Sequence, residues 1–325
     1  MIPISGNTLS FDESRSIWGK HLSLQNWNSV FMTPEWQESW WSIYGDNYTL
    51  QLIHILSDKR SLGIAPLALN KRKLTFIGDT DLFDYHDFIT NNDDFYPHLF
   101  ETIKSIDWDT LELVSVPEWS TTYSLLPSAA LAQGYNVAIE FEDVVPGISL
   151  PPSWEEYLGL LNKKDRHELR RKIRRLENAG DLYIRTSNAS TLQQDLKLFM
   201  SMMAESKEDK KNFLIPKRES FLQSIAVKMQ DSNFLKLFIL ELNETPVSAL
   251  MCFDYKNTRL VYNSGYVGSY ANLSVGLVLK AFCIKDAIES KLAYFDLLRG
   301  PEAYKYHLGA IDSNIHKLVV SRSLV

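Results

Sequence analysis

The sequence predicts an α/β (α+β) protein with two domains, each a mixed, largely antiparallel sheet flanked by helices. The chain has 325 residues, which exceeds the usual size of a single domain. Residues 143–152 contain three prolines and a glycine and interrupt the chain near its middle. Each half shows a helix-rich start, a meander of short strands and a strand–helix unit. We therefore expect domains at residues 1–145 and 146–325.

Capping residues and apolar alternation define the elements of the first half. Thr33, Pro34 and Glu35 supply a cap, a proline at the first helical position and an early acid, so a helix begins there. Gly63 and Pro66 punctuate a compact meander of strands. The expected strands are residues 50–56, 62–69, 74–77, 111–116 and 135–141, and the later helices lie near 95–105 and 120–132.

The second half opens with a capping box, because Glu156 follows Ser153 by three residues. A basic helix runs to Ala179 and ends before Gly180. Residues 243–246 (NETP) carry a hairpin signal between two strands. The expected strands are residues 182–186, 235–242, 247–255, 260–266 and 317–321, with helices near 192–205, 218–229 and 276–290 and a charged loop at 208–217.

A strand at 260–266, a loop rich in turn formers at 268–274 and a helix at 276–290 follow one another. The free amides at such a helix start, together with the helix dipole, attract an anion. This arrangement suits a diphosphate-bearing cofactor such as coenzyme A. An ordinary helix cap by Asn272 or Ser274 explains the same residues. Residues 294–309 (YFDLLRGPEAYKYHLG) then read as a strand and a polar loop.

Three segments carry a resemblance to a known family. They are residues 31–45 (FMTPEWQESWWSIYG), 163–180 (KKDRHELRRKIRRLENAG) and 294–309, and they keep their family order. Together they resemble the GNAT-type bacterial acyltransferases called CelD-like, which are similar to the Fem-type aminoacyltransferases. The resemblance implies two GNAT-like domains and transfer of an acyl group from acetyl-CoA or another acyl-CoA to an amine. It implies no metal ion.

The implied chemistry needs a base for the attacking amine and an acid for the leaving thiolate. Asp296 is the candidate base, with Glu302 in reserve, and Tyr304 is the candidate acid. Arg299 and Lys305 together can hold a phosphate or a carboxylate. Two structural alternatives stay open. Asp296 can instead form a salt bridge that orients Arg299 or Lys305, and Tyr304 can be a packed aromatic side chain.

The expected phosphate cradle consists of backbone amides from Leu273, Ser274, Val275 and Gly276. The sequence departs from the family here. Residues 270–277 (YANLSVGL) keep one glycine and contain no basic residue, whereas the usual pyrophosphate loop carries an arginine or glutamine followed by spaced glycines. The identity of the acyl donor therefore stays open.

Charge is distributed unevenly along the chain. Residues 1–150 hold 8 Lys/Arg against 20 Asp/Glu, whereas residues 151–325 hold 26 against 20. Eight of the thirteen residues from 163 to 175 are Lys or Arg. Arg170, Arg171 and Arg174 are the candidate contacts for a phosphate-bearing substrate. A solvated helix face, or binding of tRNA or an anionic membrane surface, explains the same charges.

These observations predict a cytoplasmic N-acyltransferase. The acceptor is a small-molecule amine, with an amino sugar of a nucleotide- or lipid-linked polysaccharide precursor as the leading class. One alternative is Fem-like transfer from aminoacyl-tRNA, and another is a non-catalytic scaffold of a polysaccharide-synthesis assembly. The only two cysteines, Cys252 and Cys283, lie in apolar settings and suggest buried thiols in a reducing compartment. No apolar run approaches the ~20 residues of a transmembrane helix.

Overall fold

The computed structural model describes residues 7–25, 27 and 29–322, which divide into two compact units. The first unit combines Met1–Val144 with Ser313–Val325, and the second is Val145–Asp312. The expected C-terminal domain, 146–325, therefore differs at its end, because its last strand belongs to the first unit. Each described sheet is mixed and largely antiparallel, with helices against it, which confirms the predicted fold class.

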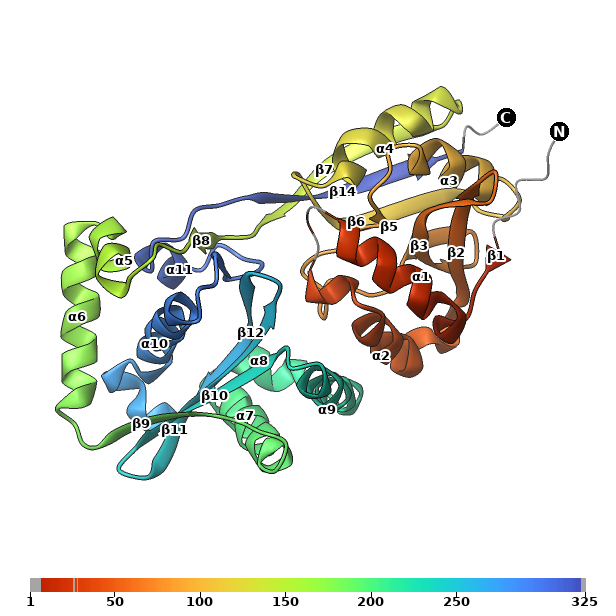
Figure 1. The fold of residues 1–325 in the computed structure, drawn as a ribbon. Coiled ribbons are helices and arrows are strands. Elements are labelled where there is room, and N and C mark those ends of the chain that lie inside the picture. The colour runs from red at the N-terminus through yellow and green to blue at the C-terminus, as the bar shows by residue number, and fades with distance from the viewer. Residues whose placement is uncertain (1–6, 26, 28, 323–325) are drawn as a thin grey trace. The chain divides into compact units, whose positions relative to one another are not determined.

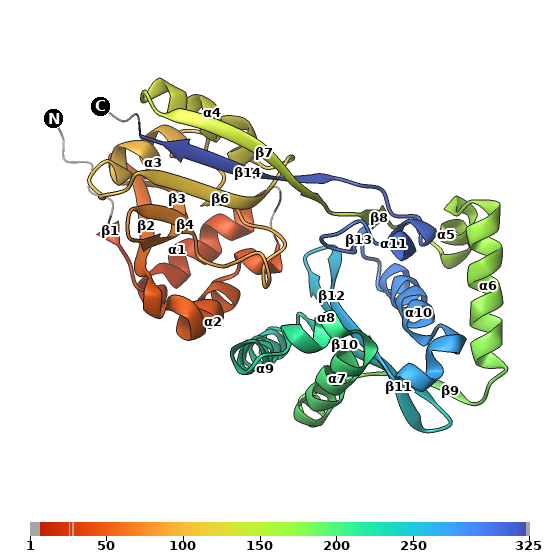
Figure 2. The ribbon, with the colours of Figure 1, turned by 180° about the vertical axis from the view of Figure 1, so that it is seen from behind.

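The sheet of the first unit has eight described strands in the order β1-β2-β3-β4-β6-β14-β7, with β5 paired to β3. Strand β14 lies between β6 and β7 and is antiparallel to both (Figure 2). The strands are β1 (Asn7–Thr8), β2 (Thr49–Ser57), β3 (Arg60–Asn70), β4 (Lys73–Phe76), β5 (Ile89–Thr90), β6 (Thr110–Pro117), β7 (Asn136–Val144) and β14 (Asn314–Ser321). The helices are α1 (Phe11–Leu24), α2 (Pro34–Tyr44), α3 (Phe95–Ile103) and α4 (Thr121–Ala132).

The second unit contains six described strands in the order β8-β13-β12-β11-β10-β9. They are β8 (Gly147–Ser149), β9 (Leu182–Thr186), β10 (Leu235–Leu242), β11 (Thr245–Tyr255), β12 (Thr258–Tyr266) and β13 (Tyr294–Asp296). The helices are α5 (Trp154–Leu160), α6 (Lys163–Glu177), α7 (Leu192–Ser206), α8 (Glu208–Phe213), α9 (Pro216–Asp231), α10 (Val275–Glu289) and α11 (Ala303–His307), and a short 3-10 helix, η3 (Gly268–Leu273), precedes α10. Helix α10 covers one face of the sheet, and α7 and α9 cover the other (Figure 1).

Two local expectations for this unit are wrong. The charged segment at 208–217 forms the short helix α8 and the start of α9 rather than a loop. The polar loop after β13 contains one helical turn, α11, which carries Tyr304 and Lys305. Both helices are too short to show an apolar period, and α8 has no buried residue. Helical periodicity therefore could not reveal them.

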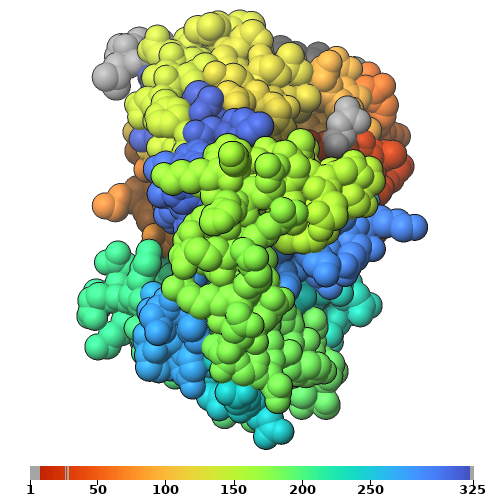
Figure 3. All heavy atoms as spheres, turned by 90° about the vertical axis from the view of Figure 1, so that its left-hand side faces the viewer, coloured from red at the N-terminus to blue at the C-terminus, as the bar shows by residue number. Residues whose placement is uncertain are grey.

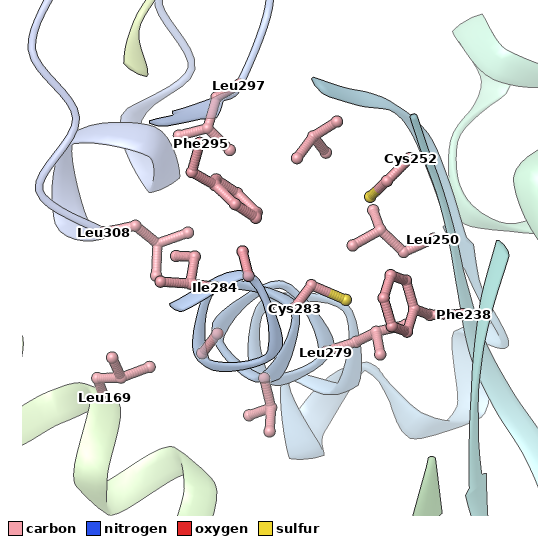
Figure 4. Packing of buried hydrophobic residues seen from close by; sticks show 14 of the residues in the cluster. Leu169, Phe238, Leu250, Cys252, Leu279, Cys283, Ile284, Phe295, Leu297 and Leu308 are labelled. Carbon is pink, nitrogen blue, oxygen red and sulfur yellow. The ribbon is translucent and has the colours of Figure 1, made fainter. Parts of the chain in front are cut away.

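The core of the second unit lies between α10 and the sheet. Leu279, Cys283 and Ile284 of α10 pack with Phe238 and Leu250 of the strands (Figure 4). Burying each large apolar side chain contributes on the order of 2 kcal/mol. Helix α6 adds Leu169 and Leu176 from the outer side of α10. This packing fixes the start of α10 relative to both β12 and α6.

Candidate functional site

Strands β12 and β13 separate after a short stretch of pairing. They pair in parallel from Thr258 with Tyr294 to Leu260 with Asp296, where β13 ends. Strand β12 continues to Tyr266, and no described strand pairs with this edge beyond Leu260. Such a divergence opens space beside the exposed edge of β12.

A cavity of about 280 Å³ lies next to this free part of β12. Four segments of the second unit contribute side chains to its wall: β12, the start of α10, the turn before α11, and the junction of α7 and α8. The lining residues are Ser206, Lys207, Lys210, Ser264, Tyr266, Ala271, Ser274, Val275, Gly276, Leu277, Lys280, Glu302 and Tyr304.

The structure brings only some of the predicted site residues into this cavity. Ser274, Val275 and Gly276 line it from the predicted cradle, and Glu302 and Tyr304 line it from the predicted catalytic set. The others are not among its lining residues. Those that lie elsewhere are Leu273, Asp296, Arg299, Lys305, Arg170, Arg171 and Arg174.

The start of α10 presents unpaired amides to the cavity. Ser274 adopts the left-handed conformation (φ 58°) and makes no capping hydrogen bond with its side chain. Within the part of the chain that the structure describes, no hydrogen bond from the amides of Val275 or Gly276 is found. The amides at a helix start carry partial positive charge, so this end of the cavity favours an anion.

Arg175 supplies the basic residue that the loop sequence lacks. Its Nη2 donates to the Ser274 Oγ at 3.1 Å, although the two residues are 99 positions apart. Its Nε is buried and has no hydrogen-bond partner among the described residues. Helix α6 packs against α10, which holds this guanidinium beside the amides. A guanidinium and two free amides fit a diphosphate, so the residues present suit the expected donor.

Tyr304 remains protonated in this site. Burial, with a smaller contribution from Glu302, raises the pKa of its phenol well above the usual value. The Nζ of Lys280 lies 5.0 Å from the centre of its ring. A phenol with such a raised pKa can donate a hydrogen bond but is a weak proton donor to a thiolate. The geometry therefore favours a hydrogen-bonding role for Tyr304.

Asp296 and Lys305 hold the turn between β13 and α11. Lys305 is 1% exposed, and its Nζ donates to the carbonyls of Leu298, Arg299 and Gly300 at 2.7–2.9 Å. The same ammonium contacts Glu302 at 2.9 Å. Asp296 accepts the Leu298 amide at 2.8 Å and is also buried. Since these contacts occupy the ammonium, the geometry favours a positioning role for Lys305.

Sequence analysis missed three polar residues of the cavity wall. Lys210 donates to the carbonyl of Ser264, and its Nζ lies 3.4 Å from the Ser264 Oγ. Lys280 donates to the same hydroxyl at 3.0 Å, and its side chain is 7% exposed. A signal for Lys280 was available, because it interrupts an otherwise apolar run four residues after Gly276. Lys210 sits among other charged residues and gives no such signal.

Burial changes the acid–base properties of both lysines. Desolvation, with repulsion from Lys280 and Lys207 and an opposing attraction from Glu302, lowers the pKa of Lys210 to about 7. Desolvation lowers the pKa of Lys280 to about 8, while Cys252, Cys283 and Glu302 act in the opposite direction. Near neutral pH, one cavity therefore holds an amine that can accept a proton and an ammonium that can release one.

The basic residues of α6 form a separate surface. A hollow of about 770 Å³ is lined by Lys163, Lys164, Arg166, His167, Glu168, Arg170 and Arg174. Figure 3 shows α6, in green, exposed along its length. Arg171 pairs with Glu168 through two contacts of 2.7 Å, and Arg170 lies 3.2 Å from Glu155. The surface carries an excess of positive charge, and part of it is already neutralised.

Comparison with known families identifies the second unit. Residues 163–306 match the model described as the acetyltransferase (GNAT) domain. This part of the chain belongs to the GNAT family of acyltransferases. The family resemblance of residues 163–180 and 294–309 is thereby confirmed. No curated protein matches the sequence significantly.

Solved structures share the fold of the whole chain. FemX aligns with a TM-score of 0.67 at 12% identity and covers 97% of this chain and 96% of its own. The C-terminal domain of a putative lysylphosphatidylglycerol synthetase from Agrobacterium fabrum gives 0.57 at 10% identity over 97% and 93%. A tandem GNAT protein from the clavulanic acid biosynthesis pathway gives 0.52 at 11% identity over 99% of each chain. At these identities the likeness shows a tandem GNAT fold.

Two other features are absent from the described residues. No described helix is long and apolar enough to cross a membrane. No group of three or more His, Cys, Asp or Glu side chains in the described ranges could hold a metal ion.

Proposed function

We propose that this protein transfers an acyl group, acetyl in the first instance, from a coenzyme A thioester to an amine. The observation that carries the proposal is the cavity beside the free edge of β12, with unpaired amides and Arg175 at one end. A GNAT domain implies an acyl donor of this kind. The acceptor class we propose, by analogy with the CelD-like resemblance, is an amino sugar of a nucleotide- or lipid-linked polysaccharide precursor.

Each wall of the cavity has a role in this reaction. The amides of Val275 and Gly276 and the guanidinium of Arg175 would hold the diphosphate of the donor. The thioester would extend along β12, where a backbone amide of the unpaired edge can stabilise the negative carbonyl oxygen. Tyr304 would donate a hydrogen bond near the sulfur. The cavity is too small for an entire coenzyme A, so the nucleotide would lie outside it.

The direct test is calorimetric titration of the protein with acetyl-CoA, longer acyl-CoAs and free coenzyme A, with charged tRNA as a comparison. Micromolar binding of acyl-CoA, followed by release of free thiol in the presence of an amine, is the expected result. Binding of tRNA without coenzyme A would favour the Fem-like alternative. Binding of neither would favour the non-catalytic scaffold.

Replacing Arg175 with glutamine should weaken coenzyme A binding about tenfold or more. A hydrogen bond to a charged group contributes about 1.5–3 kcal/mol, and Arg175→Gln removes the charge beside Ser274. Calorimetry with free coenzyme A measures the change. Lys172→Gln removes the same charge from the same helix and should leave the affinity within twofold. Equal effects of the two variants would contradict a specific phosphate contact.

The basic surface of α6 favours a second candidate, transfer from an aminoacyl-tRNA. Its exposed cations suit a polyanion, and the fold is shared with FemX. The triple variant Arg170→Gln, Arg171→Gln, Arg174→Gln tests it. If these side chains bind tRNA phosphates, the dependence of log K on log salt concentration should become shallower by ~0.7–0.9 per lost contact.

The same variant also tests a small phosphate-bearing substrate. An increased KM with a weaker salt dependence would support contact between these arginines and that substrate. Unchanged tRNA binding and unchanged KM would leave α6 as a solvated helix face. Binding of coenzyme A is expected to stay the same, because none of the three arginines lines the cavity beside β12.

A further inference from the structure

The lysines of the cavity converge on a single hydroxyl group. Lys210 reaches Ser264 from α8, and Lys280 reaches it from α10. Ser264 lies on the part of β12 that no described strand covers on the β13 side. This is the edge along which the thioester would lie under the proposed function, so both amines flank the reacting group.

We propose that Lys210 and Lys280, here called the lysine pair, are the catalytic base and acid of this transferase, and that the Ser264 hydroxyl returns the proton between them. The proposal rests on the proposed function, because it requires an acyl thioester in the cavity. It replaces the carboxylate base expected at Asp296, which is buried in the turn after β13 and does not line the cavity.

The charges around the lysine pair set its protonation. Lys207 faces it from the start of α8, Glu302 from the turn before α11, and Cys252 and Cys283 from the core beside α10. The pKa of Lys210 falls to about 7 and that of Lys280 to about 8, chiefly through burial. Between these two values, Lys210 is mostly neutral and Lys280 mostly charged. That is the state the reaction needs at its start.

The proton inventory then closes over one turnover. The acceptor nitrogen forms the new C–N bond, and the C–S bond of the thioester breaks. The proton lost by the nitrogen moves to the neutral amine of Lys210, and the leaving sulfur takes a proton from the ammonium of Lys280. Lys210 is now charged and Lys280 neutral. The Ser264 hydroxyl, which contacts both Nζ atoms, passes one proton across and restores the first state.

A pH–rate profile of kcat with a saturating acyl donor tests the proposal. The wild type should show a rise near pH 7 and a fall near pH 8, superimposed on the ionisation of the acceptor, which is common to all variants. Lys210→Met should abolish the rise and reduce kcat about 100-fold or more, and Lys280→Met should abolish the fall. Ser264→Ala should reduce kcat about tenfold.

Conservative variants separate proton transfer from charge. Lys210→Arg keeps a positive charge but cannot accept a proton, so it should be as inactive as Lys210→Met. Full activity of Lys210→Arg would overturn the base assignment. Lys211→Met changes the exposed neighbour on α8 and should leave kcat unchanged. Since burial opposes charging of Lys280, Lys280→Met should not lower the melting temperature at pH 7, which excludes unfolding as the cause of lost activity.

A second readout does not depend on turnover. NMR of lysine labelled with ¹³C at Cε, assigned with the two methionine variants, should show titrations near pH 7 and pH 8. Titration of either signal only near pH 10 would overturn the role of the lysine pair. Wild-type turnover that survives Lys210→Met would overturn the lysine pair alone. Failure of the wild type with every acyl donor and amine would overturn the proposed function, and the lysine pair with it.

Discussion

The variant Arg259→Met should lower the free energy of unfolding by about 3 to 5 kcal/mol. Arg259 is completely buried in β12 and pairs with both oxygens of Asp254 at 2.7 Å. It also donates to Asp286 at 2.6 Å and to the carbonyl of Cys283 at 3.0 Å. Removing one partner of a buried ion pair leaves an uncompensated charge, which costs several kcal/mol.

Guanidinium denaturation followed by far-UV circular dichroism measures this loss. Arg72→Met is the matched control, because Arg72 binds both oxygens of Asp109 at 2.6 and 2.7 Å but is half exposed. An exposed ion pair contributes about 0–1 kcal/mol, so this control should unfold almost like the wild type. A loss below about 1 kcal/mol for Arg259→Met would contradict the structural role assigned to this arginine.

The variant Gly265→Ala should cost about 3 kcal/mol and also impair activity. A Cβ at this position would lie 2.3 Å from the backbone nitrogen of Met203 and 2.4 Å from the carbonyl carbon of Met202. Both atoms belong to the backbone of α7, so the helix or β12 must move. Because Ser264 and Tyr266 flank this glycine and line the cavity, movement of β12 should disturb the site as well.

Gly159→Ala is the opposite case and serves as its control. Gly159 lies in α5 and is exposed, and a Cβ added there would have no other atom within 4 Å. Alanine has the higher helix propensity, so this change should stabilise the protein by about 0.5–1 kcal/mol. Thermal unfolding of the two variants should therefore shift in opposite directions. A neutral Gly265→Ala would show that β12 and α7 are not in close contact.

Local patterns predicted most of the regular structure. Periodicity placed the strands near 235–242, 247–255 and 260–266, which correspond to β10, β11 and β12. The capping box at Ser153 and Glu156 is present, with the Glu156 amide 3.2 Å from the Ser153 hydroxyl. An equivalent box at Ser10 and Glu13 starts α1, which sequence analysis missed, although the same rule would have found it.

The site was only partly predictable, because its chemistry depends on distant residues. Ser274, Val275 and Gly276 follow from a local strand–loop–helix pattern. Arg175 and Lys210 do not, since each meets its partner across 99 and 54 positions of sequence. No local rule connects such residues. The packing of α6 and α8 around the start of α10 and β12 is what brings them together.

The position of β14 has a consequence for biosynthesis. This strand fills the gap between β6 and β7, yet the chain reaches it only after residues 145–312 have been made. A ribosome therefore releases every residue of the second unit while the first sheet still has an open seam. We expect the later-encoded unit to finish folding first, and the nascent N-terminal sheet to need protection from mispairing until residues 314–321 emerge.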